Sequence, residues 1–198
     1  MQKKCEVKQV MKQMIEKLEE AADKINHKQV EKLIEEINRA RKIFIMGAGR
    51  SGLVGRAFAM RLMHLGFNVY VVGETVTPSL EPEDLVIAVS GSGSTKSIAE
   101  WAEIAKKMKA RLAAITANPD SRIGKIADAA VVLPVKTKER AIKGYVERQL
   151  LGEHKSLAPL GTMFELVAML FLDSLIAELM LRLNKSEEDL KLRHTTLE

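Results

Sequence analysis

Two short loops rich in glycine and serine are the parts of this sequence with the clearest chemical potential. They are Gly47-Ala48-Gly49-Arg50-Ser51-Gly52 and Ser90-Gly91-Ser92-Gly93-Ser94-Thr95. Each follows a continuous apolar run, typical of a parallel strand buried on both faces, and precedes a segment with helical periodicity. Backbone N–H groups and hydroxyls at the start of a helix bind anions. Because parallel strands end at one shared edge, where such sheets bind ligands, the loops predict a site for a phosphorylated ligand.

The first loop also matches a dinucleotide-binding pattern. Gly47, Gly49 and Gly52 fit Gly-x-Gly-x-x-Gly. Glu74 stands about twenty residues further on, where the acid that binds the ribose is expected. This match supports an alternative hypothesis, a nicotinamide-dependent oxidoreductase. It gives the second loop no role, so we favour the phosphate site.

The hydroxyl groups of both loops have a purely structural alternative. Thr95 could cap the helix that begins near it, and Ser51 could cap the helix after the first loop. One cap needs one side chain, whereas the second loop carries four hydroxyls, which favours a compact phosphate group. Arg50 and Ser51 could contact sugar hydroxyls or a negatively charged oxygen. The candidate substrate contacts are Gly49, Arg50, Ser51, Ser90, Ser92, Ser94 and Thr95.

The composition predicts one domain that acts on a small ligand. The 198 residues are 46% hydrophobic, and no linker rich in Pro, Gly or Ser divides them. The net charge is +5, but 26 acidic residues are mixed with the basic ones and aromatic residues are few, so no nucleic acid is expected as a partner. A single cysteine, Cys5, and an N-terminus without a signal-peptide core predict a cytoplasmic protein. The abundance of Lys and Glu indicates a thermophilic source.

The most apolar segment, residues 161–183, is not expected to enter a membrane. Four charged residues flank or interrupt it: Glu165, Asp173, Glu178 and Arg182. Each would cost about 2.5 kcal/mol or more at the centre of a bilayer. A helix that is apolar on most sides but lies outside a membrane is buried in a core or in a subunit interface. We likewise expect Met60, Met63 and Met169 in the core, since they stand at helical spacing with other apolar residues.

Hydrophobic periodicity predicts an α/β fold for the whole chain, 1–198, as a single domain. Residues 1–41 are expected to form one or two amphipathic helices, 42–183 the α/β core, and 184–198 a C-terminal helix and tail, opened by a capping box at Ser186. Strands are expected at 43–46, 68–72, 85–89, 111–116 and 129–133, with helices at 51–65, 95–109, 121–127 and 161–183. Their alternation predicts a five-stranded parallel sheet with helices on both faces, similar to flavodoxin and Rossmann folds. Residues 136–158 form a polar excursion, with a short helix expected at 141–151.

The second loop and several other stretches resemble one known family. Ser90, Ser92, Gly93 and Thr95 match the Ser-x-Ser-Gly-x-Thr phosphate loop of the sugar isomerase (SIS) domain. Within that family the chain is most similar to the 6-phospho-3-hexuloisomerases. The supporting stretches are 46–52, 59–66, 73–75, 87–93, 159–165 and 193–194. The chain departs from the pattern at 140–150, where it carries roughly ten extra residues, and this puts only the shape of a nearby loop in doubt.

The resemblance implies a reaction and a set of partners. The substrates would be D-arabino-hex-3-ulose 6-phosphate and fructose 6-phosphate, interconverted in the ribulose monophosphate pathway of carbohydrate metabolism. The step is a proton transfer through an enediol(ate), with no cofactor and no metal. The resemblance also implies a homotetramer whose sites are shared between subunits. Apolar faces on the N-terminal helices and on helix 161–183 favour a homo-oligomer independently.

Glu165 is the candidate base, and two histidines are candidates for a supporting role. Glu165 opens a long helix among mostly apolar residues, although Thr162 to Glu165 also reads as a capping box, in which the carboxylate would only cap the helix. His64 stands at the end of a helix, where a histidine is often only a favourable partner of the helix dipole. The family resemblance gives it a part in ring opening or proton transfer. His194 is a rival for that part, and the sequence does not decide between them.

A third class of function stays open from the sequence. SIS domains also serve as sugar-phosphate-binding modules in transcription factors, and such a sensor would need the phosphate loop but no base. The chain has no helix-turn-helix of its own, and a carboxylate at Glu165 would be superfluous in a sensor. We therefore expect an enzyme.

Overall fold

The computed structural model describes residues 6–135, 161–194 and 196. The strands are β1 (Ile43–Gly47), β2 (Val69–Val71), β3 (Leu85–Val89), β4 (Arg111–Thr116) and β5 (Ala129–Val132). The helices are α1 (Val7–Ala22), α2 (His27–Asn38), α3 (Gly49–Leu65), α4 (Lys96–Lys107), α5 (Arg122–Ile126), α8 (Thr162–Arg182) and α9 (Glu187–Lys191). The predicted short helix at 141–151 and the extra residues at 140–150 lie outside the described ranges.

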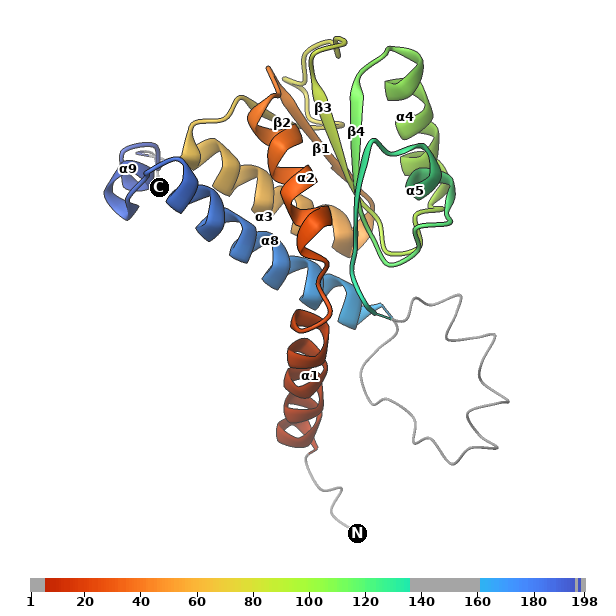
Figure 1. The fold of residues 1–198 in the computed structure, drawn as a ribbon, viewed down its shortest axis with the longest axis vertical. Helices are drawn as coiled ribbons and strands as arrows, with labels where there is room; N and C mark the ends of the chain where they lie inside the picture. Colours follow the sequence, from red (N-terminus) through yellow and green to blue (C-terminus); the bar gives the residue numbers. More distant parts are fainter. Residues whose placement is uncertain (1–5, 136–160, 195, 197–198) are drawn as a thin grey trace.

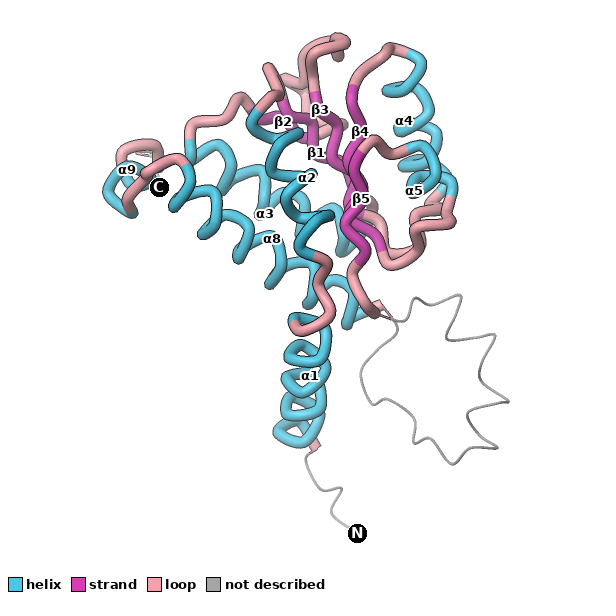
Figure 2. The backbone as a smooth tube through the Cα atoms, viewed as in Figure 1, coloured by secondary structure: helices cyan, strands magenta, loops and turns pink. Residues whose placement is uncertain are grey.

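All five strands are parallel and follow the order β2-β1-β3-β4-β5 (Figures 1 and 2). The continuous apolar runs of β1 and β3 explain their central places, because a parallel strand covered on both faces needs apolar side chains on both. The predicted α/β class and five-stranded parallel sheet are therefore confirmed. The order is that of flavodoxin-like folds, in which ligands bind where β1 and β3 meet.

Helices cover both faces of the sheet, as predicted. Alternate side chains of β1 illustrate the division: Ile43 and Ile45 join the core shared with α2, α3 and α8, whereas Phe44 and Met46 join the core shared with α4 and α5. Helix α8 lies across α3 (Figure 1) and is buried along most of its length. In the described part of the chain, no helix is long and apolar enough to cross a membrane.

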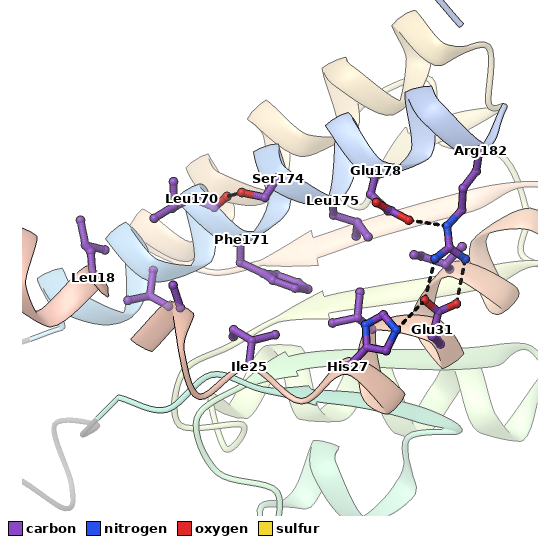
Figure 3. Close-up of a pocket in the computed structure, with 14 residues that line it drawn as sticks. Leu18, Ile25, His27, Glu31, Leu170, Phe171, Ser174, Leu175, Glu178 and Arg182 are labelled. Carbon is purple, nitrogen blue, oxygen red and sulfur yellow. Dashed lines mark hydrogen bonds and ion pairs between the residues drawn. The ribbon is translucent and has the colours of Figure 1, made fainter. Parts of the chain in front are cut away.

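Helix α1 projects from the body of the domain (Figure 1) and leaves an apolar groove where it meets α2 and α8. The groove has a volume of about 390 Å³ and is lined by residues that include Leu18, Ile25 and Phe171 (Figure 3). Arg182 closes one end with ion pairs to Glu31 at 2.6 Å and Glu178 at 2.7 Å. Only Ala21 of α1 is buried, so this helix has little cover within one chain.

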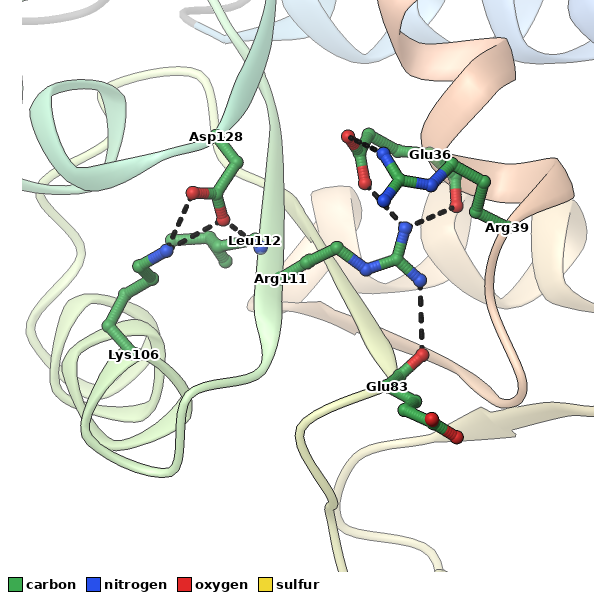
Figure 4. A network of polar contacts seen from close by, with 7 residues as sticks. All are labelled: Glu36, Arg39, Glu83, Lys106, Arg111, Leu112 and Asp128. Carbon is green, nitrogen blue, oxygen red and sulfur yellow. Dashed lines mark hydrogen bonds and ion pairs between the residues drawn. The ribbon is translucent and has the colours of Figure 1, made fainter.

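Charged side chains fix helices to the edge of the sheet opposite the two loops. Arg111, the first residue of β4, donates to Glu36 of α2 at 2.6 Å and to the backbone carbonyl of Glu83 at 3.0 Å (Figure 4). Asp128 accepts from Lys106 of α4 at 2.7 Å and from the Leu112 N–H at 2.8 Å. These contacts satisfy polar groups at the amino end of β4 and beside it.

Two local predictions need correction. Helix α3 begins at Gly49 with Ala48 as its N-cap, so Ser51 lies in the first turn and does not cap the helix. Met60 and Met63 are 47% and 40% exposed on α3 and do not belong to the core of the described chain, whereas Met169 packs against it. Helical spacing alone does not distinguish a face buried in a core from one that only another molecule can cover.

Asp128→Asn should lower the free energy of unfolding at pH 7 by about 1 kcal/mol. The substitution removes a charged acceptor of hydrogen bonds from two donors, Lys106 and Leu112, but the side chain is 37% exposed, so solvent screening reduces the effect. Burial alone would raise the pKa of Asp128, but the hydrogen bonds from Lys106 and Leu112 outweigh it and hold this pKa below its usual value.

The pH dependence follows from that direction. The contribution of Asp128 is present above the pKa of the unfolded chain, about 3.9, and is lost as the pH falls through the lowered value of the folded state. Urea unfolding of both proteins between pH 7 and pH 2 should show the difference shrinking at the acid end. Asp173→Asn, at an exposed position of α8, is the control. An equal loss in that variant would contradict the role of Asp128.

Candidate functional site

A cavity of about 330 Å³ lies where the carboxyl ends of β1 and β3 meet. Gly47 and Val89, the last residues of the two strands, stand opposite each other in the parallel register. The cavity walls come from both predicted loops and from the first turn of α8. The lining residues are Ala48, Gly49, Arg50, Ser51, Val89, Ser90, Gly91, Ser92, Thr95, Gly161, Phe164 and Glu165.

Close backbone contacts shape the first loop. A Cβ built on Gly52 would stand 2.7 Å from the carbonyl oxygen of Gly47, so only glycine fits there. Gly49 has φ +55°, a left-handed conformation that glycine adopts at little cost. The start of α3 therefore lies directly against the end of β1, and Arg50 and Ser51 stand at the cavity.

The second loop presents its hydroxyl groups in different ways. Ser90 is buried, and its Oγ makes no hydrogen bond within the described ranges, so a polar atom in the cavity wall lacks a protein partner. Thr95 is the N-cap of α4, but its side chain makes no capping hydrogen bond, so the capping explanation does not hold for it. The Ser92 Oγ accepts from the Ser94 N–H at 3.2 Å.

Ser94 is the exception among the predicted contacts. It is exposed and does not line the cavity. Its hydroxyl donates to the Ser92 carbonyl at 3.4 Å, within the loop itself. In this structure Ser94 supports the loop, and the other six predicted contacts line the site.

Backbone hydrogen bonds hold the second loop against the segment after β4. The Ala117 N–H donates to the Gly91 carbonyl at 3.0 Å, and the Ile123 N–H donates to the Gly93 carbonyl at 3.1 Å. Gly93 has φ +61°, and a Cβ there would collide with Ser121. The loop is therefore fixed on two sides before any ligand binds, which favours tight binding of a small anion.

The structure brings Glu165 to the first loop. Its Oε2 lies 3.3 Å from Nε of Arg50, and its side chain is only 14% exposed. The alternative explanation, a capping box from Thr162 to Glu165, is wrong, because α8 begins at Thr162 and Gly161, with φ +91°, is the N-cap. The surroundings of Glu165 are also less apolar than expected, since a guanidinium stands beside it. A carboxylate, a cation and an anion-binding loop thus share one cavity, a set suited to acid–base chemistry on a phosphorylated substrate.

The two predicted histidines lie together but far from this cavity. The rings of His64 and His194 are stacked, with centroids 5.1 Å apart and planes at 28°. His64 lies in the last turn of α3 and Ser51 in its first turn, so about 20 Å of helix separates these two residues. Within one chain the histidines therefore do not join Glu165, contrary to a site built from a single subunit.

The acid of the dinucleotide pattern has a different partner. Glu74 follows β2 and forms an ion pair with Arg56 on α3. This pair holds the loop after β2 against α3, so a structural contact explains Glu74 without a ribose.

Three residues of the site that carry no charged or hydroxyl side chain were not among the site residues predicted from the sequence. Phe164, Gly161 and Gly91 all line the cavity. Gly161 could have been found, because a glycine before a long apolar run is a common helix boundary. Phe164 lies in the stretch 159–165 that resembles the family, but neither its type nor its spacing distinguished it from the other apolar residues at the start of α8.

Comparisons with known proteins identify the family of this chain. The SIS domain family model matches residues 36–151. The 3-hexulose-6-phosphate isomerase of Methanocaldococcus jannaschii is 44% identical over 85% of this chain and 83% of its own. That of Bacillus subtilis is 40% identical over 94% of this chain and 96% of its own. A crystal structure from Methanococcus jannaschii, from which a 3-hexulose-6-phosphate isomerase function was inferred, has 39% identity and a TM-score of 0.77, covering 98% of this chain and 100% of its own.

The chain belongs to the SIS domain family. Its similarity to named isomerases over most of its length confirms the prediction of an enzyme of the isomerase class.

His64 should make the protein less stable in mild acid. Burial, followed by repulsion from His194 and Arg61, lowers the pKa of His64 below its usual value of 6.5. The unfolded chain therefore takes up more protons below about pH 6.5, and the folded state loses stability as the pH falls from there to the lowered value. The urea midpoint should fall less between pH 7.5 and pH 5.5 in His64→Gln than in the wild type.

An exposed histidine provides the control for this measurement. His27 of α2 is 83% exposed, and His27→Gln should keep most of the acid sensitivity of the wild type. If His64→Gln kept all of it, another group would be responsible.

Proposed function

We propose that this protein interconverts D-arabino-hex-3-ulose 6-phosphate and fructose 6-phosphate by proton transfer. The observation that carries the proposal is the position of Glu165, a largely buried carboxylate that shares a cavity with a hydroxyl-rich loop at the start of a helix. The named isomerases among the relatives support the choice of substrate. A carbonyl that moves between neighbouring carbons needs a base and no external electron acceptor, and a bound phosphate group would hold the substrate beside that base.

The second loop would bind the phosphate group. Ser90, Ser92 and Thr95 line the cavity beside the N-terminus of α4, where backbone N–H groups and the positive end of the helix dipole favour an anion. The unpaired hydroxyl of Ser90 would gain a partner there. Charge-assisted hydrogen bonds of this type contribute about 1.5 to 3 kcal/mol each.

Glu165 would act as the base. Starting from fructose 6-phosphate, it takes the hydrogen on C3 as a proton. The electron pair of that bond forms the C2–C3 double bond, and the carbonyl electrons move onto O2, which gives an enediolate. A proton then returns to C2 and another reaches O2, while the O3 hydroxyl loses its proton, so that C3 becomes the carbonyl carbon.

Arg50 would stabilise the charge that develops in this step. Its guanidinium stands 3.3 Å from the Glu165 carboxylate in the absence of substrate. When the carboxylate accepts the proton, it loses its negative charge as the enediolate oxygen gains one. The guanidinium can therefore pair first with the carboxylate and then with the enediolate oxygen. This is the arrangement expected for electrostatic stabilisation of an oxyanion.

Glu165→Gln should lower kcat by about a hundredfold or more, the usual scale for loss of a general base. Glutamine keeps the shape of the side chain, so binding of fructose 6-phosphate should persist. The measurement is proton NMR in heavy water, which follows exchange of the C3 hydrogen and the appearance of the 3-ketose phosphate. Asp173→Asn, at an exposed position of the same helix, is the control and should retain activity.

The outcomes separate the proposals. Full activity of Glu165→Gln would exclude this residue as the base. A wild-type protein that binds fructose 6-phosphate without exchanging the C3 hydrogen would indicate a sensor or a different phosphosugar.

The proposed enzyme is a homo-oligomer, a tetramer by its family resemblance, with sites shared between subunits. One line of support is α1, a helix of 16 residues with one buried side chain, because an isolated helix of that length is marginal in water. Val7, Met11 and Ile15 are 63%, 57% and 52% exposed on it and form one apolar stripe.

The second line of support is α3. Leu53, Met60 and Met63 are exposed on this helix, with Leu53 at 65%. If two copies of α3 pair antiparallel about a two-fold axis, the end that carries His64 approaches the neighbour's first loop. His64 or His194 could then assist ring opening or proton transfer at a site whose base belongs to another subunit.

Mixed oligomers of two variants, each lacking a different catalytic group, test this arrangement. Glu165→Gln and His64→Asn should each have low activity, whereas hybrids assembled from differently tagged copies should regain intact chemistry at roughly half of their sites. Replacing His64→Asn by His194→Asn decides which histidine takes part. Each parent is first checked for folding and size by circular dichroism and gel filtration. Hybrids no more active than their parents would place the whole site in one chain.

A further inference from the structure

The phenyl ring of Phe164 lies directly on the backbone of Gly91, in the middle of the second loop. A Cβ built on Gly91 would stand 2.8 Å from Cγ of the ring and 3.0 and 3.2 Å from its two Cδ atoms. Gly91 is not among the described glycines with positive φ. Glycine is therefore required here for space, and the space that it leaves is filled by the ring.

Gly91 is clamped between this ring and strand β4. Its carbonyl accepts hydrogen bonds from the Ala117 N–H at 3.0 Å and from the Thr116 hydroxyl at 3.3 Å. Its neighbours in the chain, Ser90 and Ser92, both line the cavity. A shift of either serine toward a bound anion must therefore be accommodated at the ring of Phe164.

Phe164 is also bound to the residue that carries the carboxylate. It is 3% exposed and stands in the first turn of α8, next to Glu165. The N–H groups of both residues point to the Gly161 carbonyl, at 3.1 and 3.4 Å. Both residues thus belong to one hydrogen-bonded turn, so a change in the position of the ring would be transmitted to the backbone that carries the carboxylate.

We propose that Phe164 is a positioning residue that couples the phosphate loop to Glu165. A bound phosphate would restrict the loop, and the loop contacts the ring through Gly91. The ring in turn restricts the first turn of α8, which carries the carboxylate of Glu165. This inference rests on the proposed function, because it takes Glu165 as the base. It adds that the binding energy of the phosphate serves to place the base as well as to retain the substrate.

Phe164→Leu and Phe171→Leu form a matched pair of variants. Phe171 lies two turns further along α8, is 9% exposed and lines the groove beside α1 (Figure 3), away from the cavity with the two loops. Both substitutions remove a similar apolar volume from the same helix, so both should lower the thermal midpoint by similar amounts. Only Phe164→Leu removes the contact with Gly91.

Kinetics separates positioning from a structural role. On fructose 6-phosphate, Phe164→Leu should lower kcat about tenfold, the scale expected when a catalytic group is displaced by less than 1 Å, and should change KM less. Phe171→Leu should change neither. A loss confined to KM would make Phe164 part of the phosphate wall only, and equal losses in the two variants would make its role structural. Either result would overturn the proposal.

Hydrogen exchange with inorganic phosphate tests the coupling without turnover. In the wild type and in Phe171→Leu, phosphate should slow amide exchange severalfold in two peptides, 88–96 and 162–168. In Phe164→Leu only the loop peptide should respond. The proposal fails if the loop is protected while 162–168 is unaffected in the wild type. If the loop itself does not respond, phosphate does not bind there, and the assigned phosphate site falls together with the coupling.

Discussion

Parallel hydrogen bonding between β1 and β3 places the two glycine-rich loops side by side. The chain reaches β3 only after adding β2 on the far side of β1, so the helices that follow β1 and β3 leave toward opposite faces of the sheet. The space between the two helix starts is the cavity. With Gly47 opposite Val89, both loops begin at the same level of the sheet, and a one-residue change in register would turn the side chains of one strand toward the wrong core.

The strands, the sheet and the two loops could be predicted because their signals are local. Continuous apolar runs indicate buried parallel strands, and small residues at their ends indicate close backbone contacts. The start of α3 could not be predicted from side chains, because Ser51 looks like a better cap than Ala48. The contact between Gly47 and Gly52 decides where the helix begins, and this contact exists only in the folded chain.

The partner of Glu165 could not be predicted from neighbouring residues either, because this contact also forms only in the folded chain. Its partner Arg50 is 115 positions away in the sequence. The capping-box pattern, in contrast, involves only the four residues from Thr162 to Glu165. Gly161 adopts a left-handed conformation and starts α8 one residue earlier than the box requires, which leaves the carboxylate available to the cavity. Phe164 lies in a stretch that resembles the family, but its contact with Gly91 could not be predicted, because it depends on the absence of a side chain in a different part of the chain.

The length of α3 sets the condition under which the histidines can take part in the chemistry. One helix carries a cavity residue at its first turn and His64 at its last, and a rigid helix cannot bring its two ends together. A second copy of α3 that runs antiparallel can bring its own His64 close to the first turn of this one. In the proposed assembly the exposed apolar residues of α3 would be covered by the same pairing that completes the site, so that stability and catalysis would depend on one contact. A chain that folds alone would then hold the phosphate and the base but lack the imidazole, and its activity would rise with assembly.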